Sequence, residues 1–196
     1  MISRSLLAEG GPEALSMREV ARRAGCTHQA PYHYFEDRET IVATLVVEGF
    51  DELTHRLSVA NDLASAQGLR AAMIASAEAY VGFALSQAGV FQIMFRPAMC
   101  DAARFPAVQA AGARAYAQLE RLNQLVHGAK ASAALATILW AHVHGLACLL
   151  LEGSLPQRFA SEALRSQHLC EVGEQFVALM GLSAAASTTS RSDQPA

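Results

Sequence analysis

The side chains best suited to chemistry lie in one short segment, CTHQAPYHYF, at positions 26–35. Two histidines and two tyrosines flank a proline there, and the segment contains no charged residue. Imidazole and phenol groups at this density suit either a catalytic pocket or a surface that contacts another polymer. His28 and His33 lack a carboxylate or thiol partner at the spacing of zinc ligands. We therefore expect no metal at this segment.

A second candidate group lies on the apolar segment 139–153, LWAHVHGLACLLLEG. Trp140, His144, Cys148 and Leu151 recur every three or four residues, which places them on one face of a helix. His144 and Cys148 could serve a metal, a cofactor or an enzyme, as could His142. His144 could equally be a buried histidine bonded to a neighbour, or the polar group of a ligand cavity that has Trp140 as a wall.

The chain shows no catalytic set. No nucleophile, base and acid stand together in the sequence, and no glycine loop suited to phosphate is present. We expect no catalytic residue, no cofactor and no enzymatic activity. The aromatic and sulfur-containing side chains of segment 80–99 are typical of a core, but they also adapt to variable apolar ligands. We therefore predict a small hydrophobic effector, bound by Tyr80, Phe83, Phe91, Phe95, Met99, Trp140 and His144.

Three predicted helices position the segment 26–35. The first spans 16–25: Ser16 can cap it with Glu19 three residues on, and Gly25 can end it in a left-handed conformation. Its apolar positions 17, 20, 21 and 24 form one stripe, which we expect to be buried. A short helix over 28–34, capped by Thr27, follows with Ala30 and Tyr34 facing inward. A long helix over 38–64 begins after the cap residue Asp37.

The rest of the chain also reads as helices, over 68–87, 89–96, 105–127, 131–153 and 160–181, separated by proline and glycine. No sustained strand alternation is present, so the fold is expected to be all-α. The small, polar residues of 183–196 predict a disordered tail.

Segment 131–151 is almost uncharged and long enough to span a membrane. Because two histidines and a glycine interrupt it, we expect a buried core or a subunit interface instead, and no membrane.

Composition limits the partners that the chain can bind. Hydrophobic residues make up 52% of the 196 residues and the net charge is −3. Any contact with nucleic acid must therefore come from a local basic patch, in which we place Arg18, Arg22, Arg23 and Arg38. We expect this patch to make few phosphate contacts, so that DNA affinity depends only weakly on salt.

The four cysteines show no CxxC spacing and are expected to be buried thiols, Cys26 included. No secretion signal is indicated, so a cytoplasmic protein is expected.

Helix, glycine turn and short capped helix with outward polar groups form a helix-turn-helix. Segment 16–46, SMREVARRAGCTHQAPYHYFEDRETIVATLV, resembles the N-terminal region of TetR-type transcriptional regulators. The match includes Val20-Ala21, Ala24-Gly25, Tyr32-His33 and Arg38-Glu39. The residues expected to contact DNA, between Ser16 and Phe35 and just beyond, are Arg18, Thr27, His28, Gln29, Pro31, Tyr32, His33 and Arg38. Segment 139–153 resembles the Trp…His-Gly stretch of a regulatory domain found in some members.

The resemblance implies a DNA-binding domain over 1–45 and a helical ligand-binding and dimerisation domain over 46–182. It also implies a homodimer that binds palindromic double-stranded operator DNA, usually as a repressor released by a small molecule. A helical binder or enzyme that uses His144 and Cys148, with no role on DNA, is the alternative. The family normally has a fuller first helix than residues 1–10 provide, so we expect upstream residues to complete it.

Overall fold

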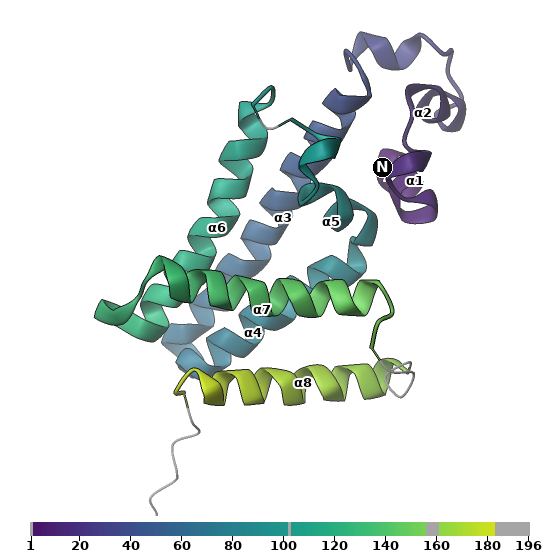
Figure 1. The fold of residues 1–196 in the computed structure, drawn as a ribbon. Helices are drawn as coiled ribbons and strands as arrows, with labels where there is room; N and C mark the ends of the chain where they lie inside the picture. The colour runs from purple at the N-terminus through teal and green to yellow at the C-terminus, as the bar shows by residue number, and fades with distance from the viewer. Residues whose placement is uncertain (1, 102, 156–160, 183–196) are drawn as a thin grey trace, which may run out of the picture.

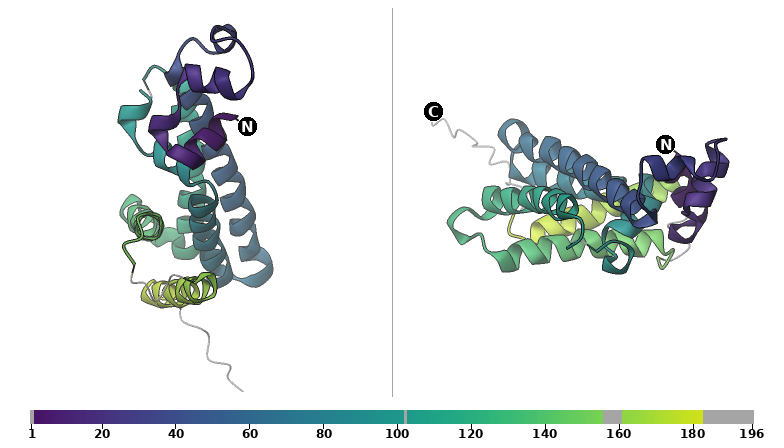
Figure 2. Two further views of the ribbon diagram at one scale, coloured as in Figure 1. Left: turned by 90° about the vertical axis from the view of Figure 1, so that its right-hand side faces the viewer. Right: turned by 90° about the horizontal axis from the view of Figure 1, so that it is seen from above.

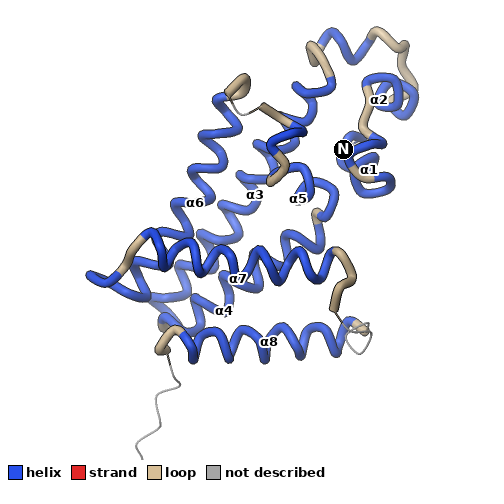
Figure 3. Tube along the Cα trace, in the orientation of Figure 1, coloured by secondary structure: helices blue, strands red, loops and turns tan. Residues whose placement is uncertain are grey.

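The structure is a computed structural model, and it describes residues 2–101, 103–155 and 161–182. Every regular element in these residues is a helix (Figure 3), which confirms the all-α prediction. The helices are α1 (Ile2–Gly10), η1 (Pro12–Ala14), α2 (Met17–Arg23), η2 (Ala30–His33), α3 (Arg38–Gln67), α4 (Leu69–Ser86), α5 (Ala88–Met94), η3 (Pro97–Met99), α6 (Pro106–His127), η4 (Gly128–Lys130), α7 (Ala133–Leu151) and α8 (Glu162–Leu179). The predicted tail, 183–196, lies outside the described residues.

Local capping chemistry explains where the longest helix begins and ends. Asp37 precedes α3 in an extended conformation, and its carboxylate accepts a hydrogen bond from the backbone N–H of Thr40 at 2.8 Å. This bond satisfies one of the N–H groups that a helix N-terminus leaves unpaired. Gly68, with φ of 89°, ends the helix three residues later than predicted. The five predicted helices from residue 68 onward are confirmed to within two residues at each described end.

The molecule has a small N-terminal part and a larger helical body. In Figure 1, α3 and α6 run side by side, and α7 crosses them. The second view in Figure 2 places α7 and α8 together on one side of the layer that holds α3 and α4. Helices α1 and α2 lie at the far end of α3, beside its first residues (Figure 1). The segment 24–37 is therefore carried at the tip of a long, continuous helix.

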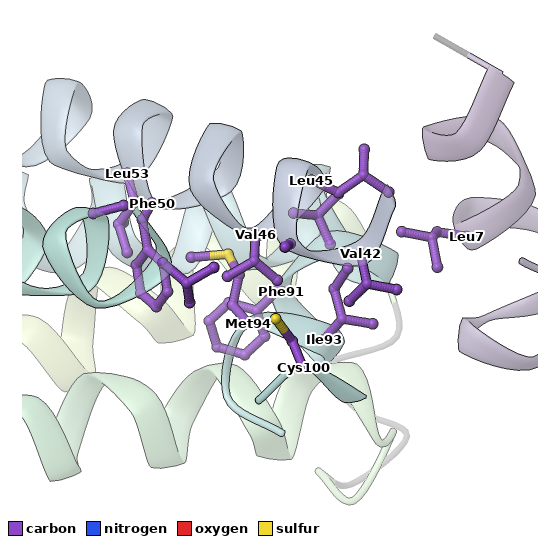
Figure 4. Packing of buried hydrophobic residues seen from close by; sticks show 14 of the residues in the cluster. Leu7, Val42, Leu45, Val46, Phe50, Leu53, Phe91, Ile93, Met94 and Cys100 are labelled. Atoms are coloured by element: carbon purple, nitrogen blue, oxygen red, sulfur yellow. The ribbon is translucent and has the colours of Figure 1, made fainter. Parts of the chain in front are cut away.

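The main hydrophobic core joins the N-terminal part to the body. Leu7 of α1 is 2% exposed and belongs to the same cluster as Val42 and Val46 of α3 and Ile93 of α5. Figure 4 shows Leu7 pointing from α1 toward Val42 and Ile93. The proposed domain boundary at residues 45 and 46 thus falls inside α3, where the core is continuous. A displacement of α3 or α5 therefore acts on α1 through direct contact.

Helix α7 is the element that met the membrane criterion in the sequence. It is long and apolar enough to span a bilayer by length and composition, and it is the one such helix among the described residues. In the fold it packs against α4 and α6, with Ala136, Leu139 and Ala147 buried. Ile138 and Leu149 remain exposed at 51% and 44%. One face of α7 therefore belongs to the core, and another is left without a partner within the described chain.

Candidate functional site

The first candidate site begins with α2, whose local signals act as the sequence indicates. The hydroxyl of Ser16 accepts a hydrogen bond from the N–H of Glu19, and Met17 and Ala21 are buried. Gly25 adopts a φ of 64°, the left-handed conformation that glycine adopts without steric cost. The predicted buried stripe is too long, however. Ala24 is exposed, because α2 ends at Arg23 and the chain turns away from the core.

The segment after Gly25 is shorter and tighter than predicted. In place of an α-helix over 28–34 capped by Thr27, the structure has the 3₁₀-helix η2, Ala30–His33, with no side-chain cap. Pro31 has no N–H to donate to Thr27, so one α-helical bond cannot form there. The backbone instead makes bonds three residues apart, from Ala30 to Thr27 and from Tyr32 to Gln29, each at 3.0 Å.

This tight turn presents a row of polar side chains to solvent. Thr27, His28, Gln29, Tyr32 and His33 are all exposed, and the rings of His28 and Tyr32 lie 5.9 Å apart. Tyr34 was expected to face inward but is 83% exposed, because a 3₁₀-helix places residues three apart, not four, in register. Tyr34 therefore joins this row, although the assumed α-helical spacing excluded it.

Two residues predicted to contact DNA are used inside the protein. Pro31 is buried, so its ring packs inward and is not available to a partner. Arg38 is partly buried, and its guanidinium donates to the backbone carbonyls of Leu15 and Pro12 at 2.6 Å. Those carbonyls close the turn between η1 and α2, so Arg38 holds α2 against the start of α3. Both side chains position the segment and do not extend from it.

Intramolecular ion pairs use most of the positive charge near this site. Arg22 and Arg23 both bond to the carboxylate of Glu19, and Arg23 also bonds to Glu9. The hydrogen bond from Arg22, together with Arg23, lowers the pKa of Glu19 to about 2. Arg18 differs: it is exposed, and its guanidinium has no ion pair or hydrogen bond within the described residues. Of the four arginines of the predicted patch, Arg18 is the one whose guanidinium has no partner among the described residues.

The second candidate site is a cavity of about 260 Å³ in the helical body. Helices α3, α4, α6, α7 and α8 all contribute to its walls, and Phe95 lines it from the residue that follows α5. Tyr80, Phe95 and Trp140 were predicted to bind the effector, and they do line this cavity. The site is therefore assembled from segments more than a hundred residues apart in the chain.

The other predicted ligand-binding residues lie outside the cavity lining. Phe83 and Phe91 are 0% and 3% exposed and form the core behind its wall, and Met99 packs against the same core. His144 faces Tyr80: the Tyr80 hydroxyl accepts from Trp140 Nε1 at 3.3 Å and lies 2.8 Å from His144 Nδ1. The tautomer of the imidazole decides which of the two groups donates in that bond. Of the alternatives for His144, the structure thus shows a histidine bonded to a neighbour.

Burial also bears on the enzyme alternative. It lowers the pKa of His144 and raises the pKa of the Cys148 thiol, so both groups are held neutral. With Nδ1 bonded to Tyr80, this pair offers no thiolate and no free nitrogen on that side for a metal.

The expectation of four buried thiols was wrong for two of them: Cys100 is buried and Cys148 partly so, but Cys26 and Cys170 are exposed. Cys26 turns out of the core and donates to the carbonyl of Ala21 at 3.6 Å.

Sequence reasoning missed the polar end of the cavity. Asn61 is 1% exposed; its amide donates to the backbone carbonyl of Gln118 at 2.9 Å, and its oxygen accepts from the Ser76 hydroxyl at 2.7 Å. These three residues come from α3, α4 and α6, and no pattern in the sequence connects them. His142, also in the lining, stacks on Phe176 of α8 with 3.7 Å between ring centroids.

Comparison with known proteins identifies both parts of the chain. Residues 3–45, which hold the exposed turn, match the family model of bacterial regulatory proteins of the tetR family. Residues 73–172, which provide most of the cavity, match the tetracyclin repressor-like C-terminal domain. The chain belongs to the TetR family. It is a DNA-binding transcriptional regulator and not an enzyme, and segment 24–37 belongs to its helix-turn-helix.

Solved structures support the fold of this TetR-family regulator. A protein of unknown function from Rhodococcus sp. RHA1 is 27% identical, with a TM-score of 0.71 over 93% of this chain and 92% of that one. The TetR family transcriptional regulator PfmR from Thermus thermophilus is 14% identical, with a TM-score of 0.67 over 94% and 97%. The regulatory protein SCO4313 is 21% identical, with a TM-score of 0.63 over 87% and 90%. A search of curated proteins gives no match.

Proposed function

We propose that the protein is a ligand-responsive repressor that binds a palindromic operator as a homodimer in the cytoplasm. The observation that carries this proposal is the row of exposed polar side chains on the turn between α2 and α3. These residues are Thr27, His28, Gln29, Tyr32 and His33, and the structure adds Tyr34; Arg18, exposed on α2, completes the set. Exposed groups on this turn can form bonds with a duplex without first breaking bonds within the protein.

Each of these groups suits one part of a DNA duplex. The amide of Gln29 can form two hydrogen bonds with the edge of adenine in the major groove. The hydroxyl of Tyr32 and the imidazole of His33 can donate to phosphate oxygens, which fixes the orientation of the protein. Arg18 can neutralise one phosphate. Since Arg22, Arg23 and Arg38 are engaged within the protein, we expect few phosphate contacts in each subunit.

The proposed dimer uses faces of α7 and α8 that are left uncovered by the described residues. Ile138 and Leu149 of α7 are exposed, and so are Leu164 and Leu179 of α8, at 49% and 83%. Burying these side chains against a second copy would remove apolar surface from water. A symmetric dimer would then present two recognition turns to half-sites roughly 34 Å apart, one turn of the duplex.

Helix α3 provides the mechanical link between effector and DNA. It lines the cavity with Phe50, Leu53, Leu57 and Asn61, and its first residue directly follows the recognition turn. Arg104, in the segment before α6, bonds to Asp37 and Glu39 at the start of α3 at 2.7 and 2.6 Å. An effector that displaces α3 would change the spacing of the two recognition turns in the dimer. The loss of DNA affinity is set by how much more tightly the effector binds the displaced arrangement than the DNA-binding one.

The test is a double substitution on the recognition turn, Tyr32→Ala with His33→Ala. We expect this variant to lose retention of the protein's own upstream DNA in a gel-shift assay, with an unchanged circular dichroism spectrum and dimer mass. The control is Gln124→Ala with Lys130→Ala, exposed positions far along α6 and η4, which should bind as the parent does. Unchanged DNA retention in the double variant contradicts the assignment.

Salt dependence supplies a second, quantitative test. Each phosphate contact contributes about 0.9 to the slope of log affinity against log salt, so Arg18→Ala should reduce the slope of a dimer by about 1.8. Arg22→Ala should change the slope far less, because Glu19 already holds the Arg22 guanidinium. A steep parental slope that Arg18→Ala leaves unchanged would place the phosphate contacts elsewhere.

A further inference from the structure

The cavity lining is long, apolar and free of charged groups within the described chain. On α3 it extends from Phe50 to Asn61, about 16 Å at the rise of an α-helix. Aromatic rings gather at the Phe50 end, where Phe95, Tyr116 and Trp140 also contribute. The lining contains no Asp, Glu, Lys or Arg among the described residues. A charged molecule would therefore have to leave water without an ion partner, which is strongly unfavourable.

The polar groups of the lining differ in whether they have hydrogen-bond donors or acceptors that are not already used within the protein. The amide of Asn61 uses both hydrogens on Gln118 and its oxygen on Ser76, so this group is largely satisfied. His142 makes no hydrogen bond within the described residues, although it lines the cavity. Its ring is held flat against Phe176 at an interplanar angle of 3°. Burial lowers the pKa of His142, so its ring offers one donor and one acceptor.

We propose that the effector is an uncharged, elongated, mainly hydrocarbon molecule with one hydroxyl or carbonyl group, which hydrogen-bonds to His142. The cavity volume of about 260 Å³ accommodates about nine non-hydrogen atoms, taking roughly 30 Å³ for each water-sized group. This inference rests on the proposed function, because it names the chemical class of the ligand that the regulator senses. His142 provides the specificity and the aromatic walls provide the apolar contact.

The chain contains a built-in reporter for this test. Trp140 is its single tryptophan and lines the cavity, so its fluorescence reports a bound molecule directly. The full-length protein is titrated at pH 7.5 with 1-nonanol and, separately, with nonanoate, two unbranched probes of matched length that differ in charge. We expect a saturable fluorescence change with 1-nonanol and at least tenfold weaker binding of nonanoate. Equal or tighter binding of nonanoate, or no saturable response to 1-nonanol, overturns the proposed ligand class.

A matched pair of variants tests the role of the imidazole. His142→Phe keeps a flat ring against Phe176 and removes both nitrogens, so 1-nonanol should bind about three- to tenfold more weakly, the effect of one lost hydrogen bond. The control, His55→Phe, changes an exposed histidine of α3 outside the lining and should leave the affinity unchanged. Unchanged affinity in His142→Phe refutes the assignment of His142.

Two separate measurements distinguish the ligand class from the role on DNA. Binding of the probe is read without DNA, and operator binding is read without the probe. If the protein retains its upstream DNA but gives no response to 1-nonanol, the ligand class is wrong and the regulator stands. If 1-nonanol binds but the protein retains no specific DNA, the proposed function is wrong.

Discussion

The close approach of α1 to α5 gives the sharpest prediction, at Gly89. A Cβ atom at this position would lie 2.6 Å from the carbonyl carbon and oxygen of Leu7 and 2.8 Å from its Cβ. Real Cβ atoms do not approach backbone atoms so closely, so Gly89→Ala must push α1 away from α5. Overpacking of this kind costs about 1–3 kcal/mol. Replacing a helical glycine by alanine returns about 0.5–1 kcal/mol.

The net loss in the free energy of unfolding should be about 1–2 kcal/mol, since backbone atoms cannot rotate out of the way as a side chain can. For a chain of this length, that lowers the thermal midpoint by about 2–8 °C. Because α1 is part of the support of the recognition turn, DNA affinity should fall as well. Thermal unfolding followed by circular dichroism and a gel-shift titration measure the two effects.

Gly82→Ala is the matched control. Gly82 is exposed on α4, and a Cβ added there would meet no atom within 4 Å. Only the gain in helix propensity remains, so the thermal midpoint should rise by about 1–4 °C. Opposite signs for the two substitutions support the packing of α1 on α5. A Gly89→Ala protein as stable as the parent would refute it.

Three further predictions concern single side chains. Ser16→Ala removes the cap of α2 and should lower the free energy of unfolding by about 1 kcal/mol in urea unfolding. Burial lowers the pKa of His142 and His144 below 6.5, so the unfolded chain binds more protons than the folded protein as the pH falls. The contribution of these histidines to stability should therefore be complete above pH 6.5 and decrease below it. Thermal midpoints at about pH 7.5 and 5.5 measure this difference. Arg104→Ala should lower the midpoint more in low salt than in about 0.5 M salt, since its ion pairs are partly exposed and therefore screened. An equal loss at both concentrations argues against this electrostatic role.

Local chemistry determined the parts of this protein that the sequence alone predicts. Ser16, Gly25 and Asp37 act within three or four residues along the chain, so their capping and turn roles could be assigned before the fold was known. The same is true of the boundaries of the five helices from residue 68 onward, which depend on local periodicity, glycine and proline. The motif over 16–46 also sufficed to indicate the family, because it combines several such local features.

Tertiary contacts decided the rest. Arg38 has a side chain suited to a phosphate, but two carbonyls more than twenty residues away take its donors. The polar end of the cavity, Asn61 with Ser76 and Gln118, exists only because α3, α4 and α6 meet there. Phe83, Phe91 and Phe95 have the same residue type and similar surroundings in the sequence, yet only Phe95 lines the cavity. Which face of a helix meets a void and which meets a neighbour depends on how the helices cross, and a one-dimensional pattern does not contain that information.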